Sequence, residues 1–247
     1  MKIATWNLRR LVAEASVRAK IILAEMHRVN ADIWVLTETH DNIRPADSYE
    51  SVASDTPDRT HSAGERWAMI WSRYPIERAI TTSDASRAVA VRVTPPRGAD
   101  LIVYGSVLPW LGSNWQEHPA KNGEAFKSAL TAQRSDWEKL RTANKDCELI
   151  VAGDLNQDLA DKHFYGSNAN RRLLKQALSA CDLRAVAASS ADPVPVHAPR
   201  RSSVDHICVP IGATRWADAT VGSWPETDWP LGNLSDHFGL FVESRDG

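Results

Sequence analysis

The amino-acid sequence predicts a mixed α/β fold in which two sheets carry helices on their outer faces. Short strand-like runs alternate with a few helical stretches, but they do not follow the strict strand–helix–strand order of a parallel sheet. Three consecutive strand candidates lie between residues 67 and 93, which favours antiparallel pairing. No internal repeat and no low-complexity linker interrupts the 247 residues, so we expect residues 1–247 to form a single domain.

The predicted strands are short runs dominated by apolar residues, as is typical of strands buried in a sheet. Tyr74 and Pro75 mark a turn between two of them, because proline fixes φ and removes a donor from the strand ladder. In chain order, the strand candidates are Lys2–Trp6, Asp32–Thr37, Trp67–Ser72, Ile76–Thr82, Ala88–Val93, Leu101–Val107, Leu149–Ala152, Val204–Val209, Ala217–Gly222 and Phe238–Glu243.

Three segments between these strands are predicted as helices. They are Leu11–Arg28, Gly123–Arg141 and Asn170–Ala180, and the first two repeat apolar residues at helical spacing. The segment Ala187–Ser203 is rich in alanine, serine and proline, so we expect it to be the longest exposed loop.

Composition limits the possible functions. Apolar residues make up 43% and charged residues 24% of the chain, which excludes disordered and fibrous classes. The net charge of −2 argues against a protein that coats nucleic acid by bulk positive charge. It does not exclude a nuclease, because a local basic patch and a metal ion can still hold phosphate.

The three cysteines, Cys147, Cys181 and Cys208, form neither a disulfide framework nor a zinc motif. We therefore expect a reducing, cytoplasmic location. The first residues lack the apolar core of a signal peptide, and no apolar run is long enough to suggest a transmembrane helix. No feature of the sequence indicates a protein partner.

Carboxylate, amide and imidazole side chains recur at the ends of the predicted strands, where functional groups on a rigid scaffold tend to lie. Two of them, Asp154 and Asn156, are spaced i and i+2, which on an extended chain puts both side chains on one side. Gly153 permits a close backbone approach or an unusual φ directly before Asp154. The full set is Asn7, Glu38, Asp154, Asn156, Asp205, Asp236 and His237.

These groups suit metal-assisted hydrolysis of a phosphoester. Mg²⁺ binds oxygen ligands, and Glu38 with either Asp236 or Asp154 would supply them. Asp154 is a candidate base for water, while Asn156 and His237 are candidate donors to the developing charge. Asp205 would orient the histidine and raise its pKa.

Each of these motifs taken alone also fits a turn, a cap or a solvated strand end. The functional interpretation depends on their occurring together, in a fixed order, each near an apolar run. Six segments carry that order: Lys2–Asn7 (KIATWN), Asp32–Glu38 (DIWVLTE), Trp71–Ile76 (WSRYPI), Val151–Asn156 (VAGDLN), Ser203–Ile207 (SVDHI) and Leu234–His237 (LSDH).

In these segments the chain resembles the endonuclease/exonuclease/phosphatase superfamily, which has the DNase I-like fold, and the resemblance runs from residue 2 to residue 237. It implies a four-layer α/β/β/α sandwich, with two mixed and mostly antiparallel sheets flanked by helices and the site at one edge of both sheets. It also implies a divalent cation, usually Mg²⁺ or Mn²⁺.

The resemblance implies a role for each site residue. Glu38 resembles the principal metal ligand, with Asn7 close by, and Asp236 resembles a ligand to this or a second metal. Asp154 resembles the residue that orients or deprotonates the attacking water, and its neighbour Asn156 resembles the residue that steadies the transition state. His237 resembles the phosphate-binding histidine, and Asp205 resembles its carboxylate partner.

The sequence departs from the family pattern in one place. Many members have a histidine or tyrosine at the end of the strand that matches Leu101–Val107, whereas here the strand ends in Ser106, Val107, Leu108, Pro109 and Trp110. Tyr104 lies inside the strand and cannot be assumed to replace that residue. One phosphate donor is therefore either absent or supplied by another segment.

Three functions remain open at this stage. A metal-dependent nuclease is favoured, the alternative is a hydrolase of a small or lipid phosphoester, and a non-catalytic binding protein is the third. Arginine pairs, at Arg171 and Arg172 and at Arg200 and Arg201, suit flanking phosphates or a solvated surface. Tryptophans in two loops, Trp110 with Trp115 and Trp224 with Trp229, would either stack a base or anchor the loops.

Overall fold

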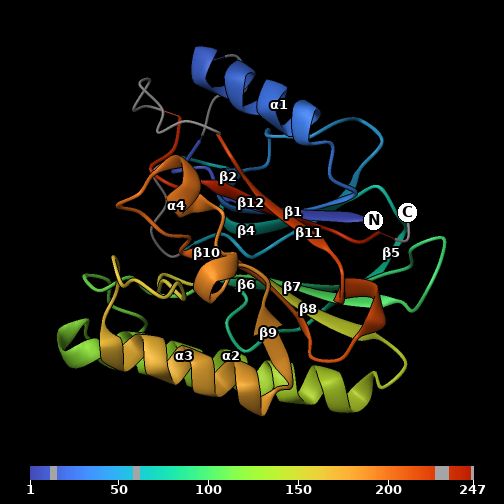
Figure 1. The fold of residues 1–247 in the computed structure, drawn as a ribbon. Helices are drawn as coiled ribbons and strands as arrows, with labels where there is room; N and C mark the ends of the chain where they lie inside the picture. The colour runs from blue at the N-terminus through green and yellow to red at the C-terminus, as the bar shows by residue number, and fades with distance from the viewer. Residues whose placement is uncertain (12–15, 58–61, 226–233, 246–247) are drawn as a thin grey trace.

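Figure 1 shows the computed structural model, which describes residues 1–11, 16–57, 62–225 and 234–245. The elements in chain order are β1 (Lys2–Asn7), α1 (Val17–Val29), β2 (Ile33–His40), β3 (Glu50–Ala53), β4 (Glu65–Ser72), β5 (Ile76–Ile80), β6 (Ala88–Val93), β7 (Leu101–Val107), η1 (Lys121–Gly123), α2 (Glu124–Ala143), β8 (Glu148–Asp154), α3 (Asn168–Ala180), β9 (Leu183–Ala185), η2 (Ser189–Ala191), α4 (Val194–His197), β10 (Asp205–Pro210), η3 (Thr214–Trp216), β11 (Thr220–Trp224) and β12 (Gly239–Glu243). Among the described residues, no helix is long and apolar enough to cross a membrane.

The strands form two six-stranded sheets. One has the order β11-β12-β1-β2-β4-β3 and the other β5-β6-β7-β8-β10-β9. Most neighbours are antiparallel, but β1 pairs with β2 in parallel, and so does β7 with β8. The predicted two-sheet fold, mixed and mostly antiparallel, is confirmed.

The two sheets stack face to face with helices on both outer faces, which gives four layers (Figure 1). α1 packs on the first sheet through a cluster that includes Ile22, Met26 and Trp34. α2 and α3 cover the second sheet through a separate apolar cluster, which includes the buried Trp137 of α2. A third apolar cluster fills the space between the sheets, where β-branched residues from both inner faces meet.

Local sequence accounts for the limits of the first helix. The side chain of Ser16 accepts a hydrogen bond from the Ala19 amide at 3.0 Å, so the helix begins at Val17 rather than at the predicted Leu11. Residues 12–15 of the predicted range lie outside the described residues. Asn30 ends the helix in the left-handed conformation, in which asparagine is tolerated better than most residues.

The prediction of one long exposed loop over Ala187–Ser203 is wrong. This segment contains η2 and α4, and Val194 and Ala198 are buried with Phe238 in a small apolar cluster. The carboxylate of Asp192 accepts hydrogen bonds from the amide and the hydroxyl of Ser203, both at 2.8 Å, and so closes the segment. The short strands β3 and β9 were also absent from the predicted elements, because three or four residues carry little periodicity.

Parallel and antiparallel pairing together bring the predicted site residues to one edge of the sandwich. β1 and β2 run in parallel with Asn7 paired to Thr37, so Asn7 at the end of β1 lies beside Glu38 of β2. In the other sheet, Asp154 at the end of β8 pairs with Asp205 at the start of β10. Contacts between β1 and both β8 and β10 join the two sheets here.

Gly153 allows β8 to reach this edge. Its φ of +131° suits glycine, and a Cβ at this position would lie 2.1 Å from the backbone oxygen of Ser106 on β7. Both reasons predicted for a glycine before Asp154, an unusual φ and a close backbone approach, are confirmed.

Alanine at Gly153 should therefore destabilise the protein far more than alanine at Gly212. Both glycines have positive φ, but no described atom lies within 4 Å of a Cβ at Gly212, so only backbone strain of about 1–2 kcal/mol is expected there. At Gly153 the collision with β7 adds to the strain, and the loss should reach roughly 3 kcal/mol or more. Urea unfolding measures both, and equal losses would contradict the close approach of β8 to β7.

Candidate active site

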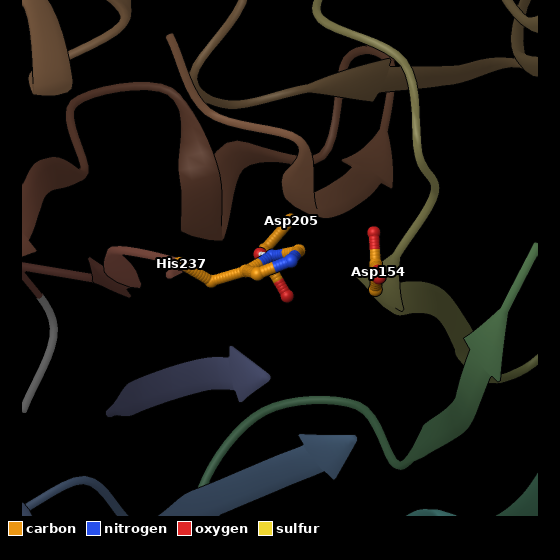
Figure 2. A group of neighbouring side chains, drawn as sticks. All are labelled: Asp154, Asp205 and His237. Atoms are coloured by element: carbon orange, nitrogen blue, oxygen red, sulfur yellow. Dashed lines mark hydrogen bonds and ion pairs between the residues drawn. The ribbon is translucent and has the colours of Figure 1, made fainter. Parts of the chain in front are cut away.

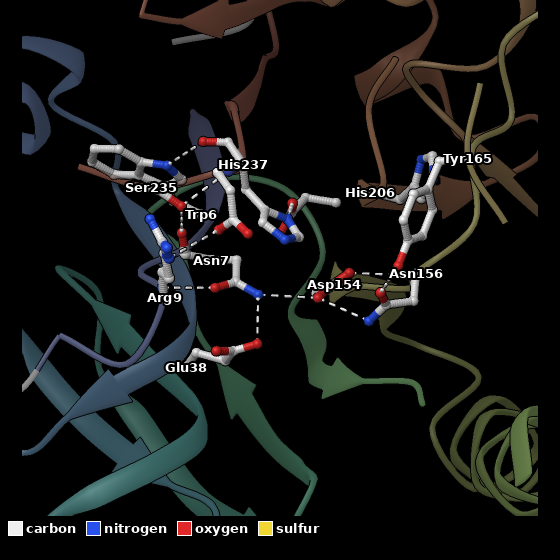
Figure 3. A network of polar contacts seen from close by, with 12 residues as sticks. Trp6, Asn7, Arg9, Glu38, Asp154, Asn156, Tyr165, His206, Ser235 and His237 are labelled. Carbon is white, nitrogen blue, oxygen red and sulfur yellow. Dashed lines mark hydrogen bonds and ion pairs between the residues drawn. The ribbon is translucent and has the colours of Figure 1, made fainter. Parts of the chain in front are cut away.

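Asn7 joins the two sheets at the site, as Figure 3 shows. Its side-chain nitrogen donates to Glu38 Oε1 at 3.2 Å and to Asp154 Oδ2 at 3.0 Å, so one amide bridges two carboxylates from different sheets. The side-chain oxygen of Asn7 accepts a hydrogen bond from the Arg9 amide at 2.8 Å, which fixes the orientation of the amide group. Asn7 is fully buried.

Asp154 lies at the centre of the site, and its side chain is held from three directions. Besides Asn7, the amide nitrogen of Asn156 donates to Oδ1 at 3.0 Å, and the Asn156 side chain donates to Oδ2 at 2.9 Å. Burial raises the pKa of Asp154, and the neighbouring Asp205 and Glu38 raise it further, against the opposing effect of His237. A carboxylate whose proton affinity is raised in this way is suited to accept a proton from water.

His237 and Asp205 form a hydrogen-bonded pair beside Asp154. The Nδ1 atom of His237 lies 2.5 Å from Asp205 Oδ2, and Figure 2 shows the ring against this carboxylate with Asp154 nearby. Burial lowers the pKa of His237, but the charges of Asp205 and Asp154 outweigh burial and raise it to about 10. The imidazole is therefore a cation at neutral pH, held in place by Asp205.

Glu38 sits on β2 in a strained conformation. Its φ of +45° is unusual for a residue other than glycine, and the register of β2 with β4 passes from Thr37 to Thr39 without a pairing at Glu38. The backbone turns there so that the carboxylate reaches Asn7, and Arg10 Nε lies 3.6 Å from Glu38 Oε2. Strain of this kind occurs where a side chain is held for a function.

The donors at this edge fit a divalent cation. The carboxylate oxygens of Glu38 are hard ligands of the kind that Mg²⁺ and Mn²⁺ prefer, whereas Asn7 turns its nitrogen toward Glu38 and its oxygen toward the Arg9 amide. Asp154, Asp205 and His237 each place one ligand atom within 4.8 Å of the others, and Asp205 Oδ1 is buried without a hydrogen-bond partner among the described residues. A cation would offset the repulsion between these carboxylates.

The other predicted site residues lie at the margin. The Asp236 side chain is 64% exposed and its Oδ1 lies 3.9 Å from Arg9 Nε, so the structure pairs it with an arginine rather than with Glu38. Arg201 hydrogen-bonds the backbone oxygen of Asp236 and stacks on Phe238, with its Cζ 4.8 Å from the ring centroid. Arg200 is exposed.

The four loop tryptophans do not share one environment. Trp115 is buried and its Nε1 donates to Asp84, so it anchors its loop, whereas the buried Trp224 ends β11 and packs against Trp6 and Trp34. Trp110 is 37% exposed and is available to a ligand. Trp229 lies outside the described residues.

Tyr165 is a site residue that the sequence did not reveal. Its hydroxyl donates to Asn156 Oδ1 at 3.2 Å, and burial together with the charges of Asp154 and Asp236 raises its pKa. The loop that carries Tyr165 is held by Asp158, whose carboxylate accepts the amides of Phe164 and Tyr165 at 2.5 and 2.9 Å. Tyr165 thus brings a phenol to the site from a different segment than β7.

Tyr104, the only tyrosine in β7, cannot take that role. Its ring is fully buried and its hydroxyl donates to Asp136 Oδ2 at 3.0 Å, on the side of the sheet that faces α2. The sequence does place two aromatic residues, at positions 164 and 165, shortly after the Asp154 motif. Their position relative to the site, however, depends on the hydrogen bonds to Asp158, which the sequence pattern does not reveal.

The chain matches the family model described as the Endonuclease/Exonuclease/phosphatase family over residues 4–237. Its fold is similar to that of AP endonuclease LMAP from Leishmania major, with a TM-score of 0.73 and 14% identity over 100% of this chain and 88% of that one. No sequence among curated proteins gives a significant match.

Two further structures show how varied the similar proteins are. The 3′ phosphatase NExo from Neisseria, bound to a product DNA hairpin, has a TM-score of 0.63 and 19% identity over 99% of both chains. Sphingomyelinase C from Streptomyces griseocarneus has a TM-score of 0.64 and 18% identity over 98% of both chains. At such identities the likeness establishes the DNase I-like fold alone.

The pair between His237 and Asp205 leads to a prediction. In Asp205→Asn the pKa of His237 should fall by roughly 1–3 pH units, because the opposing charge is lost while burial still disfavours the cation. NMR titration of the His237 ring in the metal-free protein measures this. Asp146 is an exposed carboxylate in the turn before β8, so Asp146→Asn is the matched control and should leave the pKa of His237 unchanged. An unchanged pKa in Asp205→Asn would contradict the pairing.

Proposed function

Because the chain belongs to the endonuclease/exonuclease/phosphatase family, we propose that it hydrolyses phosphoester bonds with the help of Mg²⁺ or Mn²⁺, and that its substrate is a nucleic acid. The observation that carries the proposal is the convergence of Asp154, Asn7, Asn156 and the Asp205–His237 pair at one edge of the sandwich. These groups supply a base, the amides that hold the base in place, and a cation, which are groups that phosphoester hydrolysis can use.

In the proposed reaction, Asp154 takes the proton of the attacking water. Its two oxygens are held by three hydrogen bonds from Asn7 and Asn156, so the carboxylate is oriented before substrate arrives. Burial and the nearby acids make it a stronger base than an exposed aspartate. Water adds to phosphorus as the bond to the leaving oxygen breaks.

His237 binds the phosphate in this proposal. Its Nδ1 is occupied by Asp205, which leaves Nε2 to donate to a non-bridging oxygen as negative charge grows there. Asn156 steadies the same transition state through Asp154, since its side-chain nitrogen donates to Asp154 Oδ2 and to the Leu108 backbone oxygen, and the hydroxyl of Tyr165 donates to its oxygen. Tyr165 thus acts through Asn156 and does not replace the phosphate donor missing after β7.

Glu38 would be the principal ligand of the metal, with Asn7 beside it, and Asp236 is proposed as a further ligand from its motif alone. The metal, when bound, stabilises charge on the phosphate oxygens and the leaving group. The strained backbone at Glu38 supports this assignment, since it turns the carboxylate toward the common edge.

A nucleic acid is preferred as substrate, since two of the similar structures are an AP endonuclease and a 3′ phosphatase bound to DNA. The alternative is a small or lipid phosphoester, which the likeness to a sphingomyelinase C and the net charge of −2 favour. We also propose a single domain over residues 1–247 and a cytoplasmic location, the latter supported by three free cysteines.

A substrate panel tests the proposal. Plasmid, oligonucleotide, abasic duplex and soluble phosphoesters are incubated with and without Mg²⁺ and Mn²⁺, and hydrolysis should require a metal. Asp154→Ala and Glu38→Ala should each lower kcat/KM by about a thousandfold or more, because a base or a metal ligand is lost. Asp146→Ala should retain full activity, since Asp146 lies at the opposite end of β8.

Circular dichroism must show that both site variants remain folded. Full activity of either one would show that the site is wrongly assigned. Hydrolysis of the soluble phosphoesters without any cleavage of nucleic acid would favour the alternative substrate class.

Tyr165→Phe should lower kcat by about tenfold and leave KM within about twofold, because the phenol acts through Asn156 and its loss leaves the amide less well oriented. Tyr74→Phe, in the turn between β4 and β5, is the control and should not change kcat. If Tyr165→Phe instead lowers thermal stability and raises KM together, the role of Tyr165 is purely structural.

A further inference from the structure

A cavity of about 940 Å³ lies beside the site, and the mechanism proposed above does not use it. Residues from three loops line it, including Arg10 after β1, Asp84 and Arg87 before β6, and Trp110 after β7, while Trp67 of β4 lies among them. Arg10 links the cavity to the active site, since it lines the cavity and its Nε lies 3.6 Å from Glu38 Oε2. The cavity therefore opens next to the proposed metal ligand.

Two guanidinium groups share one aromatic ring in this cavity. The Cζ atoms of Arg87 and Arg10 lie 4.7 and 5.2 Å from the centroid of Trp67. Such stacking fixes the planes of both groups and leaves their N–H edges to bind other partners. Both arginines remain cations, because guanidinium does not lose its proton in proteins.

Arg87 has unused hydrogen-bonding capacity. Its Nη1 atom is buried and has no hydrogen-bond partner among the described residues, and Nη2 makes one long contact of 3.4 Å with the Ser113 hydroxyl. Burial lowers the pKa of Arg87, which means that its charge is incompletely solvated. A buried donor without a partner costs about 1–3 kcal/mol, so an anion that reached it would be bound strongly.

The charges that face Arg87 and Arg10 do not fill this capacity. Asp84 is the acid whose charge acts most strongly on Arg87, but its carboxylate already accepts bonds from the Trp115 ring, the Ser86 hydroxyl and the Arg87 amide. These bonds fix the loop before β6 and hence the position of the Arg87 side chain. Arg10 faces Glu38 and Glu65, each at 3.6 Å.

Trp110 adds an aromatic surface at the rim. It is 37% exposed, and its ring lies 6.5 Å from that of Trp67 at an interplanar angle of 46°. An exposed indole beside a guanidinium with free N–H groups matches a nucleotide, which joins a flat base to a phosphate. A small phosphoester without a base would use only the arginine.

We propose that this cavity binds the nucleotide next to the scissile phosphodiester of an unpaired nucleic-acid strand, with Arg87 on its phosphate and Trp110 stacked on its base. The inference rests on the proposed function and deepens it by specifying an unpaired strand and the residues that bind its nucleotide. An unpaired base offers its face to an indole, whereas a base within a duplex is already stacked on its neighbours.

The test measures binding in an Asp154→Asn background, so that no strand is cut. Two fluorescein-labelled strands of equal length are compared by anisotropy: oligothymidylate, and a strand of tetrahydrofuran abasic units that keeps the phosphates without the bases. Trp110→Ala should weaken oligothymidylate binding about tenfold and abasic binding less than about twofold, because only stacking is lost. Trp110→Phe should keep most of the affinity.

Arg87→Gln should weaken binding of both strands about tenfold and reduce the slope of log K against log salt by about 0.7, as expected for one lost phosphate contact. Arg97→Gln is the matched control, since this exposed arginine lies beyond the opposite end of β6. Melting temperatures verify that the variants fold. Trp110→Ala tests the inference independently if Arg87→Gln does not fold.

Equal weakening of both strands by Trp110→Ala would overturn the stacking role, and an Arg87→Gln protein that matches the Arg97→Gln control would overturn the phosphate role. No binding of either strand, with hydrolysis of a small phosphoester intact, would overturn the inference while the proposed hydrolysis stands. The absence of all hydrolysis with binding intact would overturn the proposed function and leave the binding site standing.

Discussion

Repulsion between three carboxylates is the constraint on which this site depends. Glu38, Asp154 and Asp205 meet where the two sheets end, and both neighbours raise the pKa of the buried Asp154. The fold opposes this repulsion with the Asn7 amide, which bonds Glu38 and Asp154 together, and with the imidazolium of His237 on Asp205. Removing one member of such a network leaves a buried charge uncompensated, so the members are expected to act as a unit.

The backbone is locally strained where it holds this arrangement. Glu38 and Asn156 adopt positive φ angles, and Gly153 has a φ that suits glycine and lies against β7. Each of the three lies within two residues of the end of a strand, close to the point where strand pairing gives way to a loop. Rigid sheets thus set the position of the functional groups, and strained strand ends set their direction.

Much of the fold and of the site could be predicted from the sequence, because Asn7, Glu38 and Asp154 follow strands whose ends must lie at an edge. Tyr165 and Arg87 could not, since their positions depend on loop bonds made by Asp158 and Asp84 that leave no periodic pattern. The prediction of an exposed loop over Ala187–Ser203 failed for the same reason. Its alanines and prolines resemble a solvated linker, but the Asp192 bonds and a small apolar cluster hold it against the protein.

A net charge of −2 is compatible with a polyanionic substrate when cations are concentrated where the substrate binds. Arg9, Arg10 and Arg87 surround the acidic centre, and two of them are held in place by stacking on Trp67. Under the proposed function, the acids would hold a metal ion at the centre, while the arginines would face the phosphates around it. Substrate choice would then reside in the loops that carry the arginines and Trp110, and the chemistry would reside in the strand ends, so either could change in evolution without the other.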